Sequence, residues 1–321
     1  MLVPFDEITD ARARILPHVR RTPVISWSPP EVDARVTLKL EFLQVGGSFK
    51  ARGACNRLLS EPRAHVEVGV VTASGGNHGV GVAHAASRIG VPATVFLPET
   101  APRTTEARLL AMGAAVVRGG RAWDDAWAEA LAFSARTGAL AVHPFEDARV
   151  LAGQATVGLE LHEQVPDLDV VVVAIGGGGL IAGVASALAH LAPRTRIVGV
   201  EPEGAPSMLE SVCAGRVVEL PSVKTIAGTL APRAVGPTTL SIARERVSTI
   251  ALVSDDAMIA AMQRLWDDLR ILVEPAGAAA VAALLGGHVD LAGQSSVGVL
   301  VCGANVDSAL AARVVGAGAR P

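Results

Sequence analysis

The sequence predicts an α/β fold with parallel sheets. Short runs rich in β-branched residues alternate along the chain with longer amphipathic or alanine-rich stretches, and this alternation is typical of βαβ units. Glycine and proline lie at most junctions between the two kinds of segment, where the chain must turn. Half of the residues are hydrophobic and 18% are charged, which favours a large core over wholesale disorder.

The individual elements follow from these runs in order. The β-branched runs predict strands at Val36–Glu41, Val68–Thr72, Ala93–Leu97, Ala114–Arg118, Val170–Ile175, Arg196–Val200, Thr249–Val253 and Val297–Cys302. The amphipathic and alanine-rich stretches predict helices at Asp6–Leu16, Ser48–Leu59, Asn77–Ile89, Pro102–Met112, Asp124–Arg136, Gly153–Gln164, Leu180–Leu191, Asp255–Arg270 and Pro275–Leu285. The units between about residues 68 and 141 predict a compact lobe, and the remainder predicts a larger sheet.

Charge, hydropathy and cysteine content limit the partners and the compartment. The net charge is −3 and no tract of lysine and arginine occurs, which argues against a nucleic-acid partner. The apolar runs fall short of the roughly 20 residues that span a bilayer, and acidic residues near the N-terminus argue against a signal peptide. Three widely separated cysteines suit a reducing compartment. We therefore expect a cytoplasmic protein with neither a membrane nor a nucleic-acid partner.

The segment Gly46–Lys50 (GGSFK) lies between a predicted strand and a predicted helix. Ser48 is expected to cap this helix, which places Lys50 in the first turn. The positive end of a helix disfavours an ammonium and so lowers the pKa of the amine, as a lysine that forms a Schiff base requires. Most lysines are solvated, but this chain has only Lys39, Lys50 and Lys224, and we interpret Lys50 as functional.

A second loop, Thr72–Gly79 (TASGGNHG), joins a predicted strand to a predicted helix. Its small residues let a ligand approach the backbone, and the amides of the helix N-terminus attract a carboxylate or a phosphate. Ser74 and Asn77 add neutral hydrogen-bond donors. An ordinary turn capped by Asn77 explains the loop equally well, and His78 alone is a weak signal.

Four consecutive glycines, Gly176–Gly179, follow one predicted strand and open the next helix. Glycines at such a junction give several backbone amides free access to a phosphate. The sequence therefore predicts a phosphate site at this turn. No lysine follows the glycines, so the turn is not a P-loop.

A dinucleotide site is the competing interpretation of the same turn. Gly177, Gly179 and Ala182 match the GxGxxA pattern, and Glu201 ends the next strand at the spacing of a ribose-binding acid. This alternative, an NAD-type oxidoreductase, leaves Lys50 and the loop after Thr72 unexplained.

The last predicted strand leads into Cys302, Gly303 and Asn305. In an open sheet, ligands bind beyond the carboxyl ends of the strands, so Cys302 could contact a cofactor ring. The alternative is a buried small hydrophobe, the commoner fate of a free cysteine. Glu274 is either a carboxylate at a helix start or a site residue, and the sequence leaves that open.

Together these loops resemble the fold-type II pyridoxal-phosphate enzymes, specifically the threonine/serine dehydratase and serine racemase family. The matching motifs follow in order along nearly the whole chain at Ser48–Ala54, Ser74–His78, Gly176–Gly183, Glu201–Pro202, Glu274–Gly277 and Gly303–Asn305. The resemblance implies a fold like that of tryptophan synthase β, with two three-layer lobes and parallel-type sheets. It implies a large cofactor-binding domain of residues 1–47 and 146–321, a small mobile domain of residues 48–145, and a homodimer.

The resemblance also implies roles for single residues. Lys50 would hold pyridoxal 5'-phosphate as a Schiff base, and Lys50 and Ser74 would be catalytic. The substrate carboxylate would be bound by the loop of Ser74, Gly75, Gly76, Asn77 and His78. Residues that bind the cofactor would be Phe49 and Lys50 beside the ring, Asn77 at its 3-hydroxyl, Gly176, Gly177, Gly178, Gly179 and Leu180 at the phosphate, Cys302 at the ring nitrogen, and Glu274 and Gly303 nearby.

Three departures from the family pattern limit what the resemblance implies. Gly75 stands where racemases carry a second serine as the opposite base, so racemisation should be poor. Some relatives bind a divalent cation near Glu201; here Glu201 and the Ala205 carbonyl remain, but Ser207 replaces the second carboxylate. We therefore expect no metal, with these three residues as weak candidates, and a cation requirement stays open. The stretch Thr225–Thr229 lacks the usual Asp-Gly.

The expected function is a pyridoxal-phosphate-dependent ammonia-lyase. Its substrate would be L-serine, L-threonine or a related β-hydroxy-amino acid, and its products a 2-keto acid and ammonia. Another β-elimination, a β-replacement or a racemisation on the same scaffold is the alternative within the family. The dinucleotide-dependent oxidoreductase is the alternative from a different class.

Overall fold

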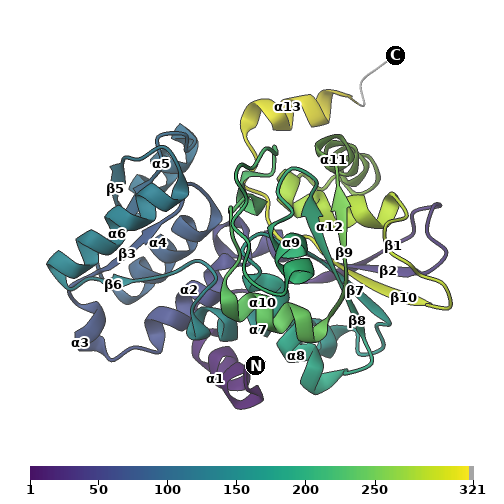
Figure 1. Ribbon diagram of the computed structural model, residues 1–321, viewed down its shortest axis with the longest axis horizontal. Coiled ribbons are helices and arrows are strands. Elements are labelled where there is room, and N and C mark those ends of the chain that lie inside the picture. The colour runs from purple at the N-terminus through teal and green to yellow at the C-terminus, as the bar shows by residue number, and fades with distance from the viewer. Residues whose placement is uncertain (318–321) are drawn as a thin grey trace.

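The computed structural model describes residues 1–317, which form two lobes, each with its own sheet (Figure 1). The larger sheet has the strand order β1 (Val24–Trp27), β2 (Arg35–Lys39), β10 (Ser296–Leu300), β7 (Val170–Ala174), β8 (Arg196–Pro202) and β9 (Val247–Val253). The smaller has the order β5 (Ala115–Arg118), β4 (Ala93–Leu97), β3 (Val70–Ala73) and β6 (Leu140–Ala141). All neighbouring strands pair in parallel except β1, which runs antiparallel to β2 at the sheet edge. The α/β prediction is confirmed.

Helices cover both faces of each sheet. Their bounds are α1 (Phe5–Ile15), α2 (Lys50–Leu59), α3 (Arg63–Val66), α4 (Asn77–Ile89), α5 (Arg103–Ala111), α6 (Trp123–Thr137), α7 (Ala148–Gln164), α8 (Gly179–Leu191), α9 (Ser207–Ala214), α10 (Pro237–Arg246), α11 (Asp255–Leu269), α12 (Pro275–Leu285) and α13 (Ser308–Ala317). In the large lobe, α7, α8 and α10 pack on one face and α11 and α12 on the other (Figure 1). In the small lobe, α4 and α5 lie opposite α6. Both lobes therefore have three layers.

The buried cores follow the two lobes. One cluster fills the large lobe, and two clusters lie on the two faces of the small sheet. Ile15 and Val150, which lie outside the predicted small domain, pack into its core. The division at residues 48 and 145, and the mobility of the small domain, stay predictions.

Two predicted helix starts were wrong by two residues or more. Helix α2 begins at Lys50, with Phe49 at the N-cap position and no side-chain cap. Ser48 is not its cap, because Ser48 is extended and forms an isolated β-bridge with Gly303. Helix α7 begins five residues before the predicted Gly153, because Asp147 accepts hydrogen bonds from two amides of its first turn.

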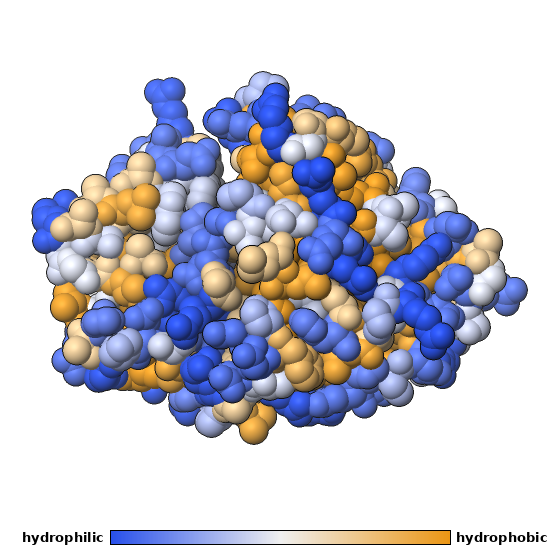
Figure 2. All heavy atoms as spheres, turned by 60° about the horizontal axis from the view of Figure 1, so that its bottom comes forward, coloured by the Kyte–Doolittle hydropathy of each residue, from blue (hydrophilic) through white to orange (hydrophobic). Residues whose placement is uncertain are grey.

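The surface seen in Figure 2 mixes hydrophilic and hydrophobic residues, and the broader hydrophobic areas lie over the large lobe. Within residues 1–317, no helix combines the length and the apolar character that crossing a membrane requires.

Candidate active site

The candidate site lies where parallel strands end at their carboxyl edge. Strand β3 leads into Ser74, β7 into the glycine turn, and β10 into Cys302. Strand β2 is parallel to β10 and leads towards Lys50. Loops at this edge of an open sheet are the usual place for a ligand, and the motifs singled out from the sequence lie on these loops.

Lys50 is the first residue of α2, and its side chain is half-buried. Its Nζ donates a hydrogen bond of 2.8 Å to the Pro144 carbonyl and lies 5.2 Å from the centre of the Phe49 ring. Burial lowers the pKa of the amine to about 8, and nearby Cys302 partly opposes that shift. A substantial fraction of the amine is therefore deprotonated, and nucleophilic, close to neutral pH.

Cys302 and Gly303 lie beside the lysine loop. The Phe49 amide donates to the Cys302 carbonyl (3.3 Å), and Ser48 bridges to Gly303. The Cys302 thiol is buried, donates to the Ala276 carbonyl (3.3 Å), and has a pKa raised by burial. Cys302 is thus a neutral thiol. A neutral thiol is a weaker partner for a ring nitrogen than a carboxylate.

Asn77, Glu274 and Asn305 form one hydrogen-bonded group. The Asn77 amide donates to a Glu274 carboxylate oxygen (2.6 Å) and accepts from Asn305. Burial raises the pKa of Glu274 to about 7. Asn77 does not cap α4, whose N-cap is Gly76 with no side-chain bond. A side chain added at Gly303 would meet Glu274 Oε1 at 2.3 Å, so the structure brings these predicted residues together.

The loop from Ser74 to Gly76 precedes the uncapped N-terminus of α4. The Ser74 hydroxyl accepts from the Gly76 amide (3.2 Å), and a Cβ at Gly76 would lie 3.0 Å from the Thr229 methyl. His78 behaves differently, because its imidazole is buried and donates through Nε2 to the Val142 carbonyl (3.1 Å). Burial and the nearby Lys50 hold the pKa of His78 well below its ordinary value.

The glycine turn forms the N-terminus of α8, which has no side-chain cap. Gly178 adopts a left-handed φ of 88°, and a Cβ at Gly177 would lie 2.2 Å from the Phe145 ring. Thr239 Oγ1 donates to the Gly177 carbonyl (2.9 Å). The backbone angle of Gly178 and the lack of space at Gly177 require glycine at both positions. Because no side chain caps the helix, its first amides are free to bind an anion. Leu180 is buried behind the turn.

No prediction from the sequence covered the segment from His143 to Phe145. Pro144 accepts from Lys50, and Phe145 packs against Gly177, so this segment connects the lysine to the glycine turn. His143 Nδ1 accepts from the Phe145 and Glu146 amides (3.2 and 2.8 Å). Strand β6 before it has only two residues, too few for a strand pattern, but a His-Pro-Phe run just after an apolar stretch was a usable signal.

Comparison with known proteins places this geometry in a family. Residues 15–303 match the model of the family described as "Pyridoxal-phosphate dependent enzyme". The chain belongs to this family. It is therefore a pyridoxal-phosphate-dependent enzyme, and its relatives support a lyase.

Relatives and solved structures match over nearly the whole chain. The chain is 43% identical to a phenylserine dehydratase of Ralstonia pickettii, covering 97% of this chain and 96% of the relative. It is 41% identical to an L-threonine ammonia-lyase of Geobacter sulfurreducens, covering 95% and 76%. The structure of maize serine racemase superposes with a TM-score of 0.93 at 36% identity, covering 96% and 95%. These likenesses confirm the fold-type II architecture.

The site residues fit pyridoxal phosphate. A half-buried amine with a pKa of about 8 suits imine formation, and the uncapped glycine N-terminus of α8 suits a phosphate.

The dinucleotide alternative is wrong. Glu201 is fully buried and accepts from the Met208 and Leu209 amides (2.7 and 2.9 Å) at the start of α9, so it is not available to a ribose. Burial raises the pKa of Glu201 to about 7.

The three weak metal candidates lie close together in the chain. The Ser207 hydroxyl is 3.5 Å from a Glu201 carboxylate oxygen, and Ala205 lies between these two residues in the sequence. In the described part of the chain, no three His, Cys, Asp or Glu side chains cluster as metal ligands.

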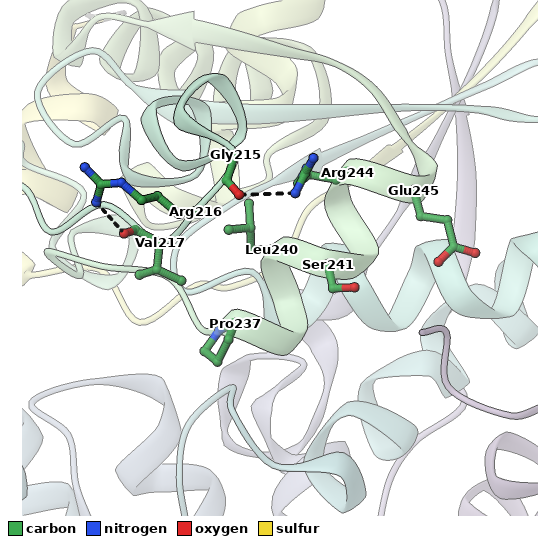
Figure 3. A pocket seen from close by; sticks show the side chains of 8 residues that line it. All are labelled: Gly215, Arg216, Val217, Pro237, Leu240, Ser241, Arg244 and Glu245. Atoms are coloured by element: carbon green, nitrogen blue, oxygen red, sulfur yellow. Dashed lines mark hydrogen bonds between the residues drawn. The ribbon is translucent and has the colours of Figure 1, made fainter.

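A surface hollow of about 500 Å³ lies elsewhere, between the end of α9 and α10 (Figure 3). Its two arginines donate hydrogen bonds to backbone carbonyls: Arg244 to that of Gly215 (3.2 Å) and Arg216 to that of Val217 (3.4 Å). The hollow shares no residue with the predicted site and contributes nothing to it.

Proposed function

We propose that this enzyme is an ammonia-lyase that converts L-serine, L-threonine or a related β-hydroxy-amino acid to a 2-keto acid and ammonia. One observation carries the proposal: the Lys50 amine, with its lowered pKa, donates to the Pro144 carbonyl, and the next residue, Phe145, packs against Gly177 in the glycine turn. Relatives named L-threonine ammonia-lyase, phenylserine dehydratase and serine racemase support the substrate class.

In this proposal each loop has one task. The amides at the start of α4, with Ser74 and Asn77, bind the substrate carboxylate, and His78 holds that loop against Val142. The glycine turn and Leu180 hold the phosphate, and Phe49, Cys302, Glu274 and Gly303 border the ring. Bound pyridoxal phosphate supplies an electron sink for the charge that develops at the α-carbon.

Lys50 moves the proton. Its neutral amine would accept the proton from the substrate α-carbon, and Ser74 would help to hold the substrate carboxylate during that transfer. The β-hydroxyl would leave as water, taking up the proton that Lys50 carries, and hydrolysis of the remaining enamine by a water molecule would give the keto acid and ammonia.

Racemisation is the alternative that Gly75 disfavours. Glycine offers no acid or base on the opposite face, and a Cβ there would meet the Ala101 Cβ at 3.0 Å. We propose that D-serine forms only at a trace rate.

The proposal also includes a homodimer, a cytoplasmic location and a mobile small domain. Sedimentation of the purified protein tests the dimer.

A keto-acid assay tests the proposed function. The holoenzyme is incubated with L-serine, L-threonine, their D-forms and threo-3-hydroxyaspartate. Keto acid from an L-hydroxy-amino acid, with little from the D-forms, is the expected result. Production of D-serine without keto acid would replace the lyase by a racemase.

Attachment of the cofactor should depend on pH with a midpoint near 8. Only the deprotonated amine attacks the aldehyde of pyridoxal phosphate, so the rate rises as pH passes upward through the pKa of about 8 and then levels off. The change in visible absorbance after mixing apoenzyme with cofactor measures this rate. A midpoint close to the ordinary lysine value of 10.5 would contradict the burial that lowers this pKa.

Replacing Gly177 by alanine should weaken cofactor binding by roughly tenfold or more. The added methyl would overlap the Phe145 ring at 2.2 Å, and moving either group disturbs the amides that hold the phosphate. Titration of apoenzyme with pyridoxal phosphate measures the effect. Gly316→Ala is the control, because a Cβ there meets nothing within 4 Å; equal affinities for the two variants would remove the turn from the phosphate site.

A further inference from the structure

Aromatic side chains gather on one side of the candidate site. Aromatic residues make up only 3% of the chain, yet two tryptophans, a histidine and a phenylalanine form one cluster, here called the aromatic wall: Trp123, Trp127, His143 and Phe145. The two indole rings stack, with 5.9 Å between their centroids and an interplanar angle of 7°. The His143 ring is edge-on to the rings of Trp127 and Phe145, with centroid distances of 5.1 and 4.6 Å.

The aromatic wall contacts two parts of the site and adjoins a third through Pro144. Trp123 Nε1 donates to the Ala73 carbonyl (2.8 Å), directly before Ser74. Phe145 packs against Gly177 in the phosphate turn. Pro144, between His143 and Phe145, accepts from Lys50. A substrate whose carboxylate binds after Ala73 and whose α-carbon lies at Lys50 therefore has its β-substituent within reach of these rings.

The wall is neutral and only partly buried. Burial and the nearby Lys50 lower the pKa of His143 to about 4, so its ring is uncharged at neutral pH. Trp123 and Trp127 cover the small-lobe core beside Ala73, but both remain partly exposed. The wall carries no cation that would pair with a substrate β-carboxylate, whereas its flat faces and edges suit another aromatic ring.

We infer that the aromatic wall is the subsite for the β-substituent, and that the preferred substrates are β-aryl-β-hydroxy-α-amino acids. The inference rests on the ammonia-lyase activity proposed above and names its substrate class. The α C–H and β C–O bonds break, Lys50 takes the α-proton, and the hydroxyl leaves as water with the proton that Lys50 carries. Hydrolysis of the released enamine gives an aryl-2-keto acid and ammonia.

Selectivity between substrates tests the inference. The kcat/KM of the holoenzyme is measured for L-threo-phenylserine, L-threonine and threo-3-hydroxyaspartate. We expect phenylserine to exceed L-threonine by about tenfold or more, because the ring is buried against apolar surface, and hydroxyaspartate to be the poorest. Turnover of L-threonine with equal or lower kcat/KM for phenylserine would overturn the subsite and leave the lyase standing; no keto acid from any substrate would overturn both.

Substitution of the wall separates recognition from folding. Trp123→Ala should lower the ratio of phenylserine to threonine kcat/KM by about tenfold, and Trp123→Phe, which keeps a ring, should restore most of it. Trp266→Ala is the matched control, because Trp266 is a partly buried tryptophan of α11 that contacts Arg270; its ratio should not change. Equal losses for both substrates in Trp123→Ala, with the cofactor still bound, would assign this ring to positioning the loop after Ala73 and overturn the inference.

Discussion

Replacing Lys50 by alanine will lower kcat for keto-acid formation by about four orders of magnitude. The substitution removes the group that moves the α-proton, and a positioned acid or base alone is worth roughly 10²–10⁴-fold. It also removes the amine that attaches the cofactor in the resting enzyme. The Pro144 carbonyl loses its 2.8 Å donor, but no core packing is lost, so the variant should fold.

Single-turnover and steady-state assays of keto acid measure this loss. Lys224→Ala is the control, because Lys224 is exposed and lies outside the site. Its kcat should stay within a factor of two. A Lys50→Ala enzyme that retains more than one per cent of the activity would mean that another group abstracts the proton.

Replacing Arg52 by alanine will destabilise the fold by about 3–5 kcal/mol, because the change leaves buried carboxylates without their partner. The Arg52 guanidinium is fully buried and donates to both carboxylate oxygens of Glu41 and to both of Glu160. Lys39, also fully buried, adds a 2.9 Å bond to Glu160. These side chains connect α2, the helix that begins at Lys50, to the end of β2 and to α7.

Denaturant unfolding of the apoprotein measures the change. Arg103→Ala is the matched control: its side chain is 81% exposed and pairs with Glu106, and exposed pairs contribute at most about 1 kcal/mol. Similar losses for the two variants would show that the buried group adds no more than a surface pair.

The regular elements were predictable where local signals agree. Helix α4 ends before Gly90, which takes a left-handed φ of 66°, and α12 begins at Pro275; both helices have the predicted bounds. Strands β1 and β6 were missed because they are short, with four and two residues. Their pairing depends on partners distant in sequence, which no local pattern reveals.

The site was partly predictable for the same reason. Lys50, the Ser74 loop and the glycine turn carry their signal in consecutive residues. Phe145 and Thr239 contact Gly177 from distant segments, and the pairing of Arg52 with Glu160 spans 108 positions. Such contacts join segments that are distant in the sequence and arise only when the chain folds, so the sequence offered no spacing from which to infer them.

The most direct test concerns the lysine that carries the cofactor. The purified holoenzyme is reduced with borohydride, digested, and its pyridoxyl-labelled peptide identified by mass spectrometry. A single label on residue 50 is what this structure predicts, because the other two lysines lie outside the site. A label on Lys39 or Lys224, or reduction that leaves every lysine unmodified, would contradict it.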